Sequence, residues 1–118
     1  MNLEVYRHYC LSKKHATESF PFSNLPDVLV FKVAGKMFSA TNITTFSGIS
    51  VKCDPDTIDE MRATFPAVTG HTYFSNRHWS NVVMDHSIPD KQIFSWIDAS
   101  YELTVAKLTK KQRAEIAL

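Results

Sequence analysis

The chain has 118 residues, with thirteen lysines and arginines against twelve acidic residues, so its formal net charge is +1. This length suits one hydrophobic core, and we expect a single domain over residues 1–118. A hydrophobic fraction of 44% with 21% charged residues excludes a disordered or collagen-like chain. Because the molecule is almost neutral, nucleic-acid binding would have to depend on where its cations gather.

Two cysteines, Cys10 and Cys53, are too few for a disulfide framework and do not form a C-x-x-C motif. Both stand among apolar residues, so we expect buried free thiols. The N-terminal segment carries charges from Glu4 onward and lacks an uninterrupted apolar stretch, which argues against a signal peptide. No stretch approaches the roughly 18 to 20 apolar residues that cross a bilayer, so a cytoplasmic protein is predicted.

A helix is predicted over residues 2–13, because Asn2 can cap its first turn and apolar residues recur at three- and four-residue spacing. The segment 16–27 contains two prolines and cannot be regular helix. Phe20 and Phe22 flank the first of these prolines, and we expect both rings to fill the edge of the core.

From residue 28 onward the apolar residues alternate with a period of two, which indicates strands. Strands are expected over 28–33 and 37–42, joined by a tight turn at 34–36, and a third strand over 48–53. Because the connections are short, neighbouring strands run antiparallel. The middle of the chain therefore predicts a three-stranded antiparallel meander.

The second half of the chain predicts three helices and a fourth strand. Asp54 and Pro55 suit the start of a helix that Pro66 ends. The strongest periodic signal belongs to a long helix that begins at Pro89. After the helix that Pro66 ends, the expected elements are a loop or irregular strand over 67–76, a strand over 77–85, the long helix to about residue 108, and a final helix over 110–117 capped by Thr109.

These elements make an α+β protein, a two-layer α/β sandwich in which helices cover one face of an antiparallel sheet and leave the other partly open. Alternation places Lys32 and Lys52 on the uncovered face, since an unpaired lysine is costly to bury. Lys36 lies at the hairpin tip, and Arg77 and His78 lie at the start of the fourth strand. This local group of cations is the feature best suited to a phosphate backbone.

Catalytic and metal-binding signals are weak. The sequence has no P-loop, G-x-G-x-x-G, H-E-x-x-H or G-x-S-x-G motif, and its three glycines poorly serve a phosphate-cradling loop. His71, His78 and His86 are spaced by seven and eight residues, which is not a recognised ligand pattern. The apolar settings of the cysteines do not favour a reactive thiolate. We therefore expect no enzymatic activity, no cofactor and no metal.

Three stretches together resemble the MmcQ/YjbR family. They are the hairpin of residues 30–38, the strand-to-helix junction of 51–55, and residues 76–79 with the later pair 100–101. The resemblance runs nearly the full chain and implies a bacterial cytoplasmic protein with a CyaY-like fold that binds DNA through a double-wing arrangement of hairpins. The positions that match the family's basic pattern are Lys32, Lys36, Lys52, Arg77 and His78, with Trp79 beside them.

The same fold also resembles that of frataxin-type iron binders, whose iron site is an acidic ridge on the first helix. Here that helix carries only Glu4 before residue 14, so an iron-donor role is not supported.

Three interpretations of the basic positions stay open. In the first, the lysines and Arg77 contact phosphates of double-stranded DNA, while His78 and Trp79 shape the edge or stack there. In the second, the chain is a non-catalytic small-ligand or protein-interaction domain with a pocket around Arg77, His78 and Trp79. In the third, this segment only anchors the fourth strand to the last helix. A deep pocket ringed by Trp79, His78 and Lys52 would favour a ligand, and a continuous positive strip would favour nucleic acid.

Overall fold

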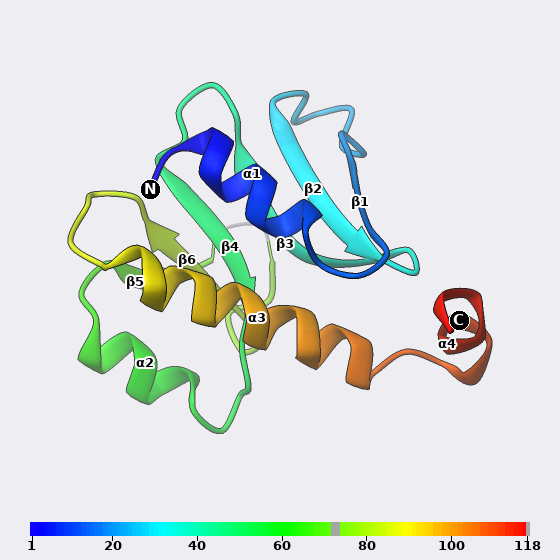
Figure 1. Ribbon diagram of the computed structural model, residues 1–118. Helices are drawn as coiled ribbons and strands as arrows, with labels where there is room; N and C mark the ends of the chain where they lie inside the picture. Colours follow the sequence, from blue (N-terminus) through cyan, green and yellow to red (C-terminus); the bar gives the residue numbers. More distant parts are fainter. Residues whose placement is uncertain (72–73, 118) are drawn as a thin grey trace.

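A computed structural model describes residues 1–71 and 74–117 of the chain (Figure 1). Ten elements follow one another along the chain, and the predicted helix–meander–helix–strand–helix order is confirmed. In chain order they are α1 (Leu3–Leu11), β1 (Ala16–Ser19), β2 (Val28–Val33), β3 (Lys36–Asn42), β4 (Gly48–Lys52), α2 (Ile58–Thr64), β5 (Val68–Gly70), β6 (Trp79–Val83), α3 (Asp90–Ala106) and α4 (Lys110–Ile116).

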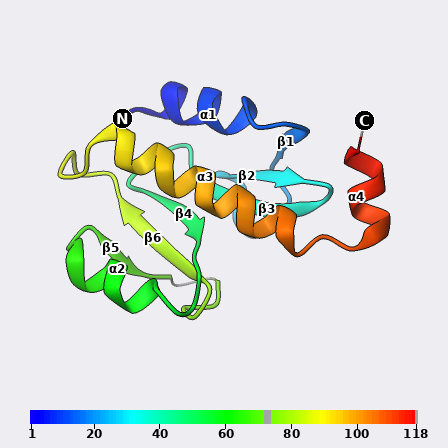
Figure 2. The ribbon, with the colours of Figure 1, turned by 60° about the horizontal axis from the view of Figure 1, so that its bottom comes forward.

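The strands form one six-stranded sheet in the order β1-β2-β3-β4-β6-β5, with antiparallel pairing throughout. Figures 1 and 2 show α1 and α3 together on one side of this sheet. The architecture is therefore the predicted α+β sandwich with a helix-covered face. One row of paired residues crosses the opposite face and runs Val30, Ala40, Ser50, Asn81 and Thr69.

The core lies between the helices and the covered face of the sheet. Tyr6 of α1 and Phe31 of β2 are fully buried, and their rings meet edge to face at 5.5 Å between centroids. Ser100, in the middle of α3, donates its hydroxyl to the Phe38 carbonyl oxygen at 2.5 Å and accepts the Lys52 amide at 2.8 Å. This buried serine thus fixes the long helix across the ends of two strands, β3 and β4.

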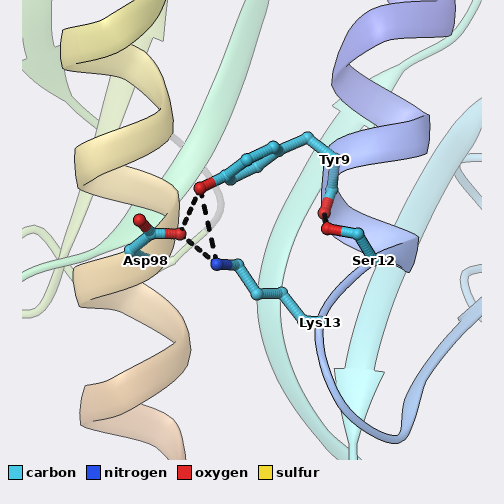
Figure 3. Close-up of polar contacts among 4 residues, drawn as sticks. All are labelled: Tyr9, Ser12, Lys13 and Asp98. Atoms are coloured by element: carbon cyan, nitrogen blue, oxygen red, sulfur yellow. Dashed lines mark hydrogen bonds and ion pairs between the residues drawn. The ribbon is translucent and has the colours of Figure 1, made fainter.

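A set of polar contacts between side chains joins α1 to α3 (Figure 3). The Tyr9 hydroxyl donates to Asp98 Oδ1 at 2.6 Å, and the Lys13 ammonium pairs with the same carboxylate oxygen. The Tyr9 ring also stacks on Phe94, with the centroids 4.0 Å apart. Burial opposes the charge of Lys13, but the hydrogen bond and charge of Asp98 outweigh it and raise the pKa of Lys13.

Two short strands complete the sheet. β1 was not predicted: it lies in the segment for which only regular helix was excluded, and its four residues pair along the edge of β2. β5 is three residues long and agrees with the strand alternative of the loop or irregular strand predicted over 67–76, of which residues 72 and 73 lie outside the described part. Such short segments become strands by pairing with a neighbouring strand, and they are too short to show an alternating pattern in the sequence.

Local chemistry corrects three further predictions. Asp54 does not begin a helix: its Oδ1 accepts the Asp56 amide at 2.9 Å and closes a turn, so α2 begins only at Ile58. Phe20 is 52% exposed and fills no core. Phe22 is half-buried, but it contacts Phe74 on the far side of the sheet.

Candidate nucleic-acid interface

The predicted cations gather at one end of the sheet. Lys36 is the first residue of β3 and pairs with Val33, and Lys52 is the last residue of β4 and pairs with Trp79. Because β3 and β4 are antiparallel, the start of β3 and the end of β4 lie at the same end of the sheet. Arg77 is exposed in the turn that leads into β6 at this same end.

The hairpin turn that carries Lys36 has a defined shape. Ala34 and Gly35 both have positive φ, at 48° and 78°, which is the geometry of a two-residue type I′ connection. Gly35 adopts this conformation without steric cost, whereas Ala34 does not. The tight turn presents Lys36 directly beside the last residue of β2.

Lys32 lies on the open face, as predicted. Its neighbours Phe31 and Val33 belong to the core on the helix side, so the lysine between them faces the other way. Lys32 pairs with Met37 after a bulge, two strands away from Lys52, which is a lateral separation of about 10 Å. The two lysines thus share one face near one end of the sheet.

The charges of three lysines interact with one another, and we call these residues the lysine cluster: Lys36, Lys52 and Lys107. Burial lowers the pKa of Lys52, and the positive charges of Lys107 and Lys36 lower it further. Of the carboxylates in residues 1–71 and 74–117, none forms an ion pair with these lysines, with Lys32 or with Arg77. The cluster is therefore a group of mutually repelling charges without a counterion among the described residues.

Lys107 was not predicted as a member of the site. It follows the last residue of α3, one turn after Thr104, whose hydroxyl hydrogen bonds to the Ser100 carbonyl oxygen of the same helix at 2.9 Å. Ser100, Thr104 and Lys107 follow one another at spacings of four and three residues, the period of one helix face. This spacing could have identified Lys107 from the sequence. It places the lysine on the side of the helix that faces the sheet, just past the end of the helix.

The segment of residues 77–79 has a structural anchor that the sequence analysis also missed. The Arg62 guanidinium of α2 donates to the carbonyl oxygens of Asn76 and Trp79, at 2.6 and 2.7 Å, and to the Ser80 hydroxyl at 3.2 Å. The segment is thus anchored to α2, a contact that the third interpretation, an anchor to the last helix, does not include.

His78 and Trp79 take different places in this segment. The His78 carbonyl oxygen accepts the Cys53 amide at 2.7 Å, which ties the turn to the end of β4. The Trp79 side chain lies on the open face opposite Lys52 but is only 9% exposed, and Phe74 approaches its ring to 5.1 Å. Little of the indole is left for an external stacking partner, while Arg77 stays exposed.

The open face also carries a cavity of about 560 Å³, which we call the open-face hollow. A second cavity, of about 500 Å³, lies on the helix side between α2 and α3. Neither has Arg77, His78 or Trp79 in its lining, so neither is the pocket of the second interpretation. Residues that line the open-face hollow include Phe22, Val28, Ala40, Ser50, Phe74 and Asn81.

A serine–histidine pair lies at the hollow, and its proton arrangement can be derived. His71 Nδ1 accepts the Phe74 backbone N–H at 3.1 Å, so that nitrogen carries no proton. Burial lowers the pKa of His71, which favours the neutral ring with its proton on Nε2. Nε2 lies 2.6 Å from Ser50 Oγ and therefore donates to it. A general base would have to accept from the serine, so this pair lacks the geometry of a nucleophilic dyad.

The remaining reactive side chains lack activating surroundings. Burial raises the pKa of Cys10 to about 12 and also raises that of Cys53, the reverse of what a thiolate nucleophile needs.

Across residues 1–71 and 74–117, no group of three or more histidine, cysteine or acidic side chains could hold a metal ion. Among the helices of the described residues, none is long and apolar enough to cross a membrane.

Comparison with known proteins matches the whole architecture. The chain is 28% identical to the uncharacterized protein YjbR of Escherichia coli K12 over 114 residues, which cover 96% of this chain and 95% of that protein. The crystal structure of Deinococcus radiodurans DR2400, with domain DUF419, superposes with a TM-score of 0.89 at 30% identity and covers 99% of this chain and 88% of its own. A Pseudomonas syringae crystal structure superposes with a TM-score of 0.74 at 22% identity, covering 88% of this chain and 99% of its own. The YjbR family model matches residues 11–103, and the chain belongs to this family.

Proposed function

We propose that the chain binds double-stranded DNA through its phosphate backbone, at the sheet end that carries the lysine cluster. The observation that supports this proposal is that the charges of Lys36 and Lys107 act against that of Lys52 at one end of the sheet, without a carboxylate partner among the described residues. An anion placed between like charges relieves their repulsion, and phosphates supply anions at regular spacing along a duplex. Lys32 and Arg77 extend the same end of the surface.

The proposed contacts predict strong salt dependence and weak sequence preference. Phosphate contacts position a protein on DNA but do not read bases. Each neutralised phosphate contributes about −0.9 to the slope of log affinity against log salt. Five contacts give a slope near −4.5, so affinity should fall roughly 500-fold between about 50 and 200 mM salt.

Fluorescence anisotropy with a labelled duplex tests the proposal. Replacing Lys36, Lys52 or Lys107 with glutamine should weaken binding and reduce the magnitude of the salt slope by about 0.9 for each lost contact. Lys91→Gln is the matched control, because Lys91 is exposed at the opposite end of the helix that Lys107 follows. Undetectable binding at low salt, or a Lys91 effect equal to that of the cluster variants, would contradict the proposal.

We also propose that this function is non-catalytic and cytoplasmic. The proton arrangement at Ser50 and His71 supports the first part, because a protonated Nε2 cannot activate the serine. Incubating the protein with a labelled duplex and separating the products tests it, since cleavage or modification of the DNA would contradict it.

A further inference from the structure

The open-face hollow holds polar groups whose hydrogen-bonding capacity is incompletely used. Ser50 is 7% exposed, and its hydroxyl makes one hydrogen bond to the described residues, which it accepts from His71 Nε2. A hydroxyl that accepts from a histidine still has its own proton to donate. Among residues 1–71 and 74–117 no acceptor takes this proton, so within the described part of the chain the Ser50 hydroxyl lines the hollow with its donor unused.

Asn81 supplies the complementary group. It pairs with Ser50 across β4 and β6, on the same face, and its Nδ2 donates to the Thr69 hydroxyl at 3.4 Å. Its Oδ1 accepts no hydrogen bond from any residue that the structure describes. The carboxamide lies over Gly48, where a Cβ would collide with it. The floor of the hollow therefore offers a hydroxyl donor beside a carboxamide acceptor.

The walls of the hollow suit a flat apolar body. Phe22 and Phe74 line it, with their ring centroids 6.4 Å apart, and Leu25, Val28 and Ala40 add to the apolar part of the lining. A cavity of about 560 Å³ lies within the range of small-molecule sites. Aromatic walls around a donor and an acceptor match a nucleobase, whose edge presents both kinds of group and whose face stacks on rings.

One member of the lysine cluster, Lys52, lies on the same strand as Ser50, although it lines the helix-side cavity and not the hollow. Lys52 lies two residues beyond Ser50 on β4 and on the same face, which is a step of about 7 Å. A ring that reached Ser50 would therefore have its sugar and phosphate beside a cation.

We propose that the open-face hollow accepts one unstacked nucleobase, with Ser50 and Asn81 on its polar edge and Phe22 or Phe74 on its face. The proposal rests on the proposed function, since the cations are what would hold the strand's phosphates there. The base can belong to a single strand or to a free nucleoside, because both present the same ring and edge.

An abasic strand separates base recognition from phosphate binding. A dT12 oligonucleotide should bind at least about fivefold more tightly than a twelve-residue abasic strand with the same phosphates, the scale of one stacked base. Phe22→Ala and Ser50→Ala should remove most of this preference and leave the salt slope and duplex affinity unchanged. Phe20→Ala is the matched control, since this exposed ring lies two residues away and is not part of the lining.

Each outcome decides between the two proposals. Equal affinity for dT12 and the abasic strand would overturn base recognition and leave phosphate binding intact. If neither strand nor the duplex binds, DNA binding fails, and a thymidine titration followed by NMR of the Asn81 side-chain amide decides the hollow by itself. A saturable shift that Phe22→Ala removes supports a nucleoside site, and no shift overturns it.

Discussion

Arg62 and Arg77 show how differently two arginines can act in one small region. Arg62 is half-buried and donates to two backbone carbonyls and one hydroxyl of residues 76–80. Arg77 lies within the segment that Arg62 holds, but its own side chain is exposed. Of the two, only Arg77 was predicted as a site residue, because sequence reasoning sees a cation beside aromatic residues and cannot see which carbonyls a distant arginine meets.

We predict that Arg62→Met destabilises the fold and that Arg77→Gln does not. Loss of the guanidinium leaves partly buried carbonyl oxygens without a donor, at a cost of about 2 kcal/mol. An exposed substitution at residue 77 should change stability by less than about 0.5 kcal/mol. Urea denaturation measures both variants. Equal stability of Arg62→Met and the unmodified protein would show that water replaces the guanidinium at these carbonyls.

At the scale of elements, the attachment of α1 to α3 depends on one carboxylate. Asp98 accepts from Tyr9 and pairs with Lys13, so two side chains of α1 meet one position of α3 (Figure 3). The Asp98 side chain is 47% exposed, which weakens the ionic part through solvent screening.

We predict that Asp98→Ala lowers the free energy of unfolding by about 1 kcal/mol, mainly through the lost tyrosine hydrogen bond. Glu102→Ala is the matched control, because Glu102 lies one turn further along the same exposed side of α3. Thermal unfolding at equal salt compares the two variants. A control variant as destabilised as Asp98→Ala would attribute the loss to helix charge and not to the contact with α1.

Elements with their own periodicity were predictable, and elements that depend on a neighbour were not. The hairpin of β2 and β3 alternates clearly, and α4 begins at Thr109 with a capping box that the sequence indicates. In contrast, β1 and β5 have only four and three residues, too few to show alternation, and pairing with β2 and β6 makes them strands. The start of α2 was missed because Asp54 suits a helix cap and a turn equally well.

At the scale of the whole molecule, charge is unevenly distributed although the net charge is only +1. Strand alternation and hairpin geometry were enough to predict that Lys32, Lys36 and Lys52 share one end of the sheet. The contribution of Lys107 required the angle at which α3 crosses β3 and β4, which Ser100 fixes through buried hydrogen bonds. The open-face hollow was equally beyond prediction, because segments distant in sequence line it.

A cluster of like charges without a counterion should reduce stability, and this gives a test that needs no DNA. We predict that Lys107→Gln raises the melting temperature by about 1–2 °C at low salt, since Lys107 and Lys36 both disfavour the charge of Lys52. Raising the salt to about 0.5 M should erase the difference, because the Debye length becomes shorter than the separation of exposed charges. Lys91→Gln should have no such effect.

A higher melting temperature together with weaker DNA binding in the same variant would show that the fold keeps these lysines together at the expense of its own stability, as binding surfaces do. A gain that survives high salt would instead point to packing at residue 107.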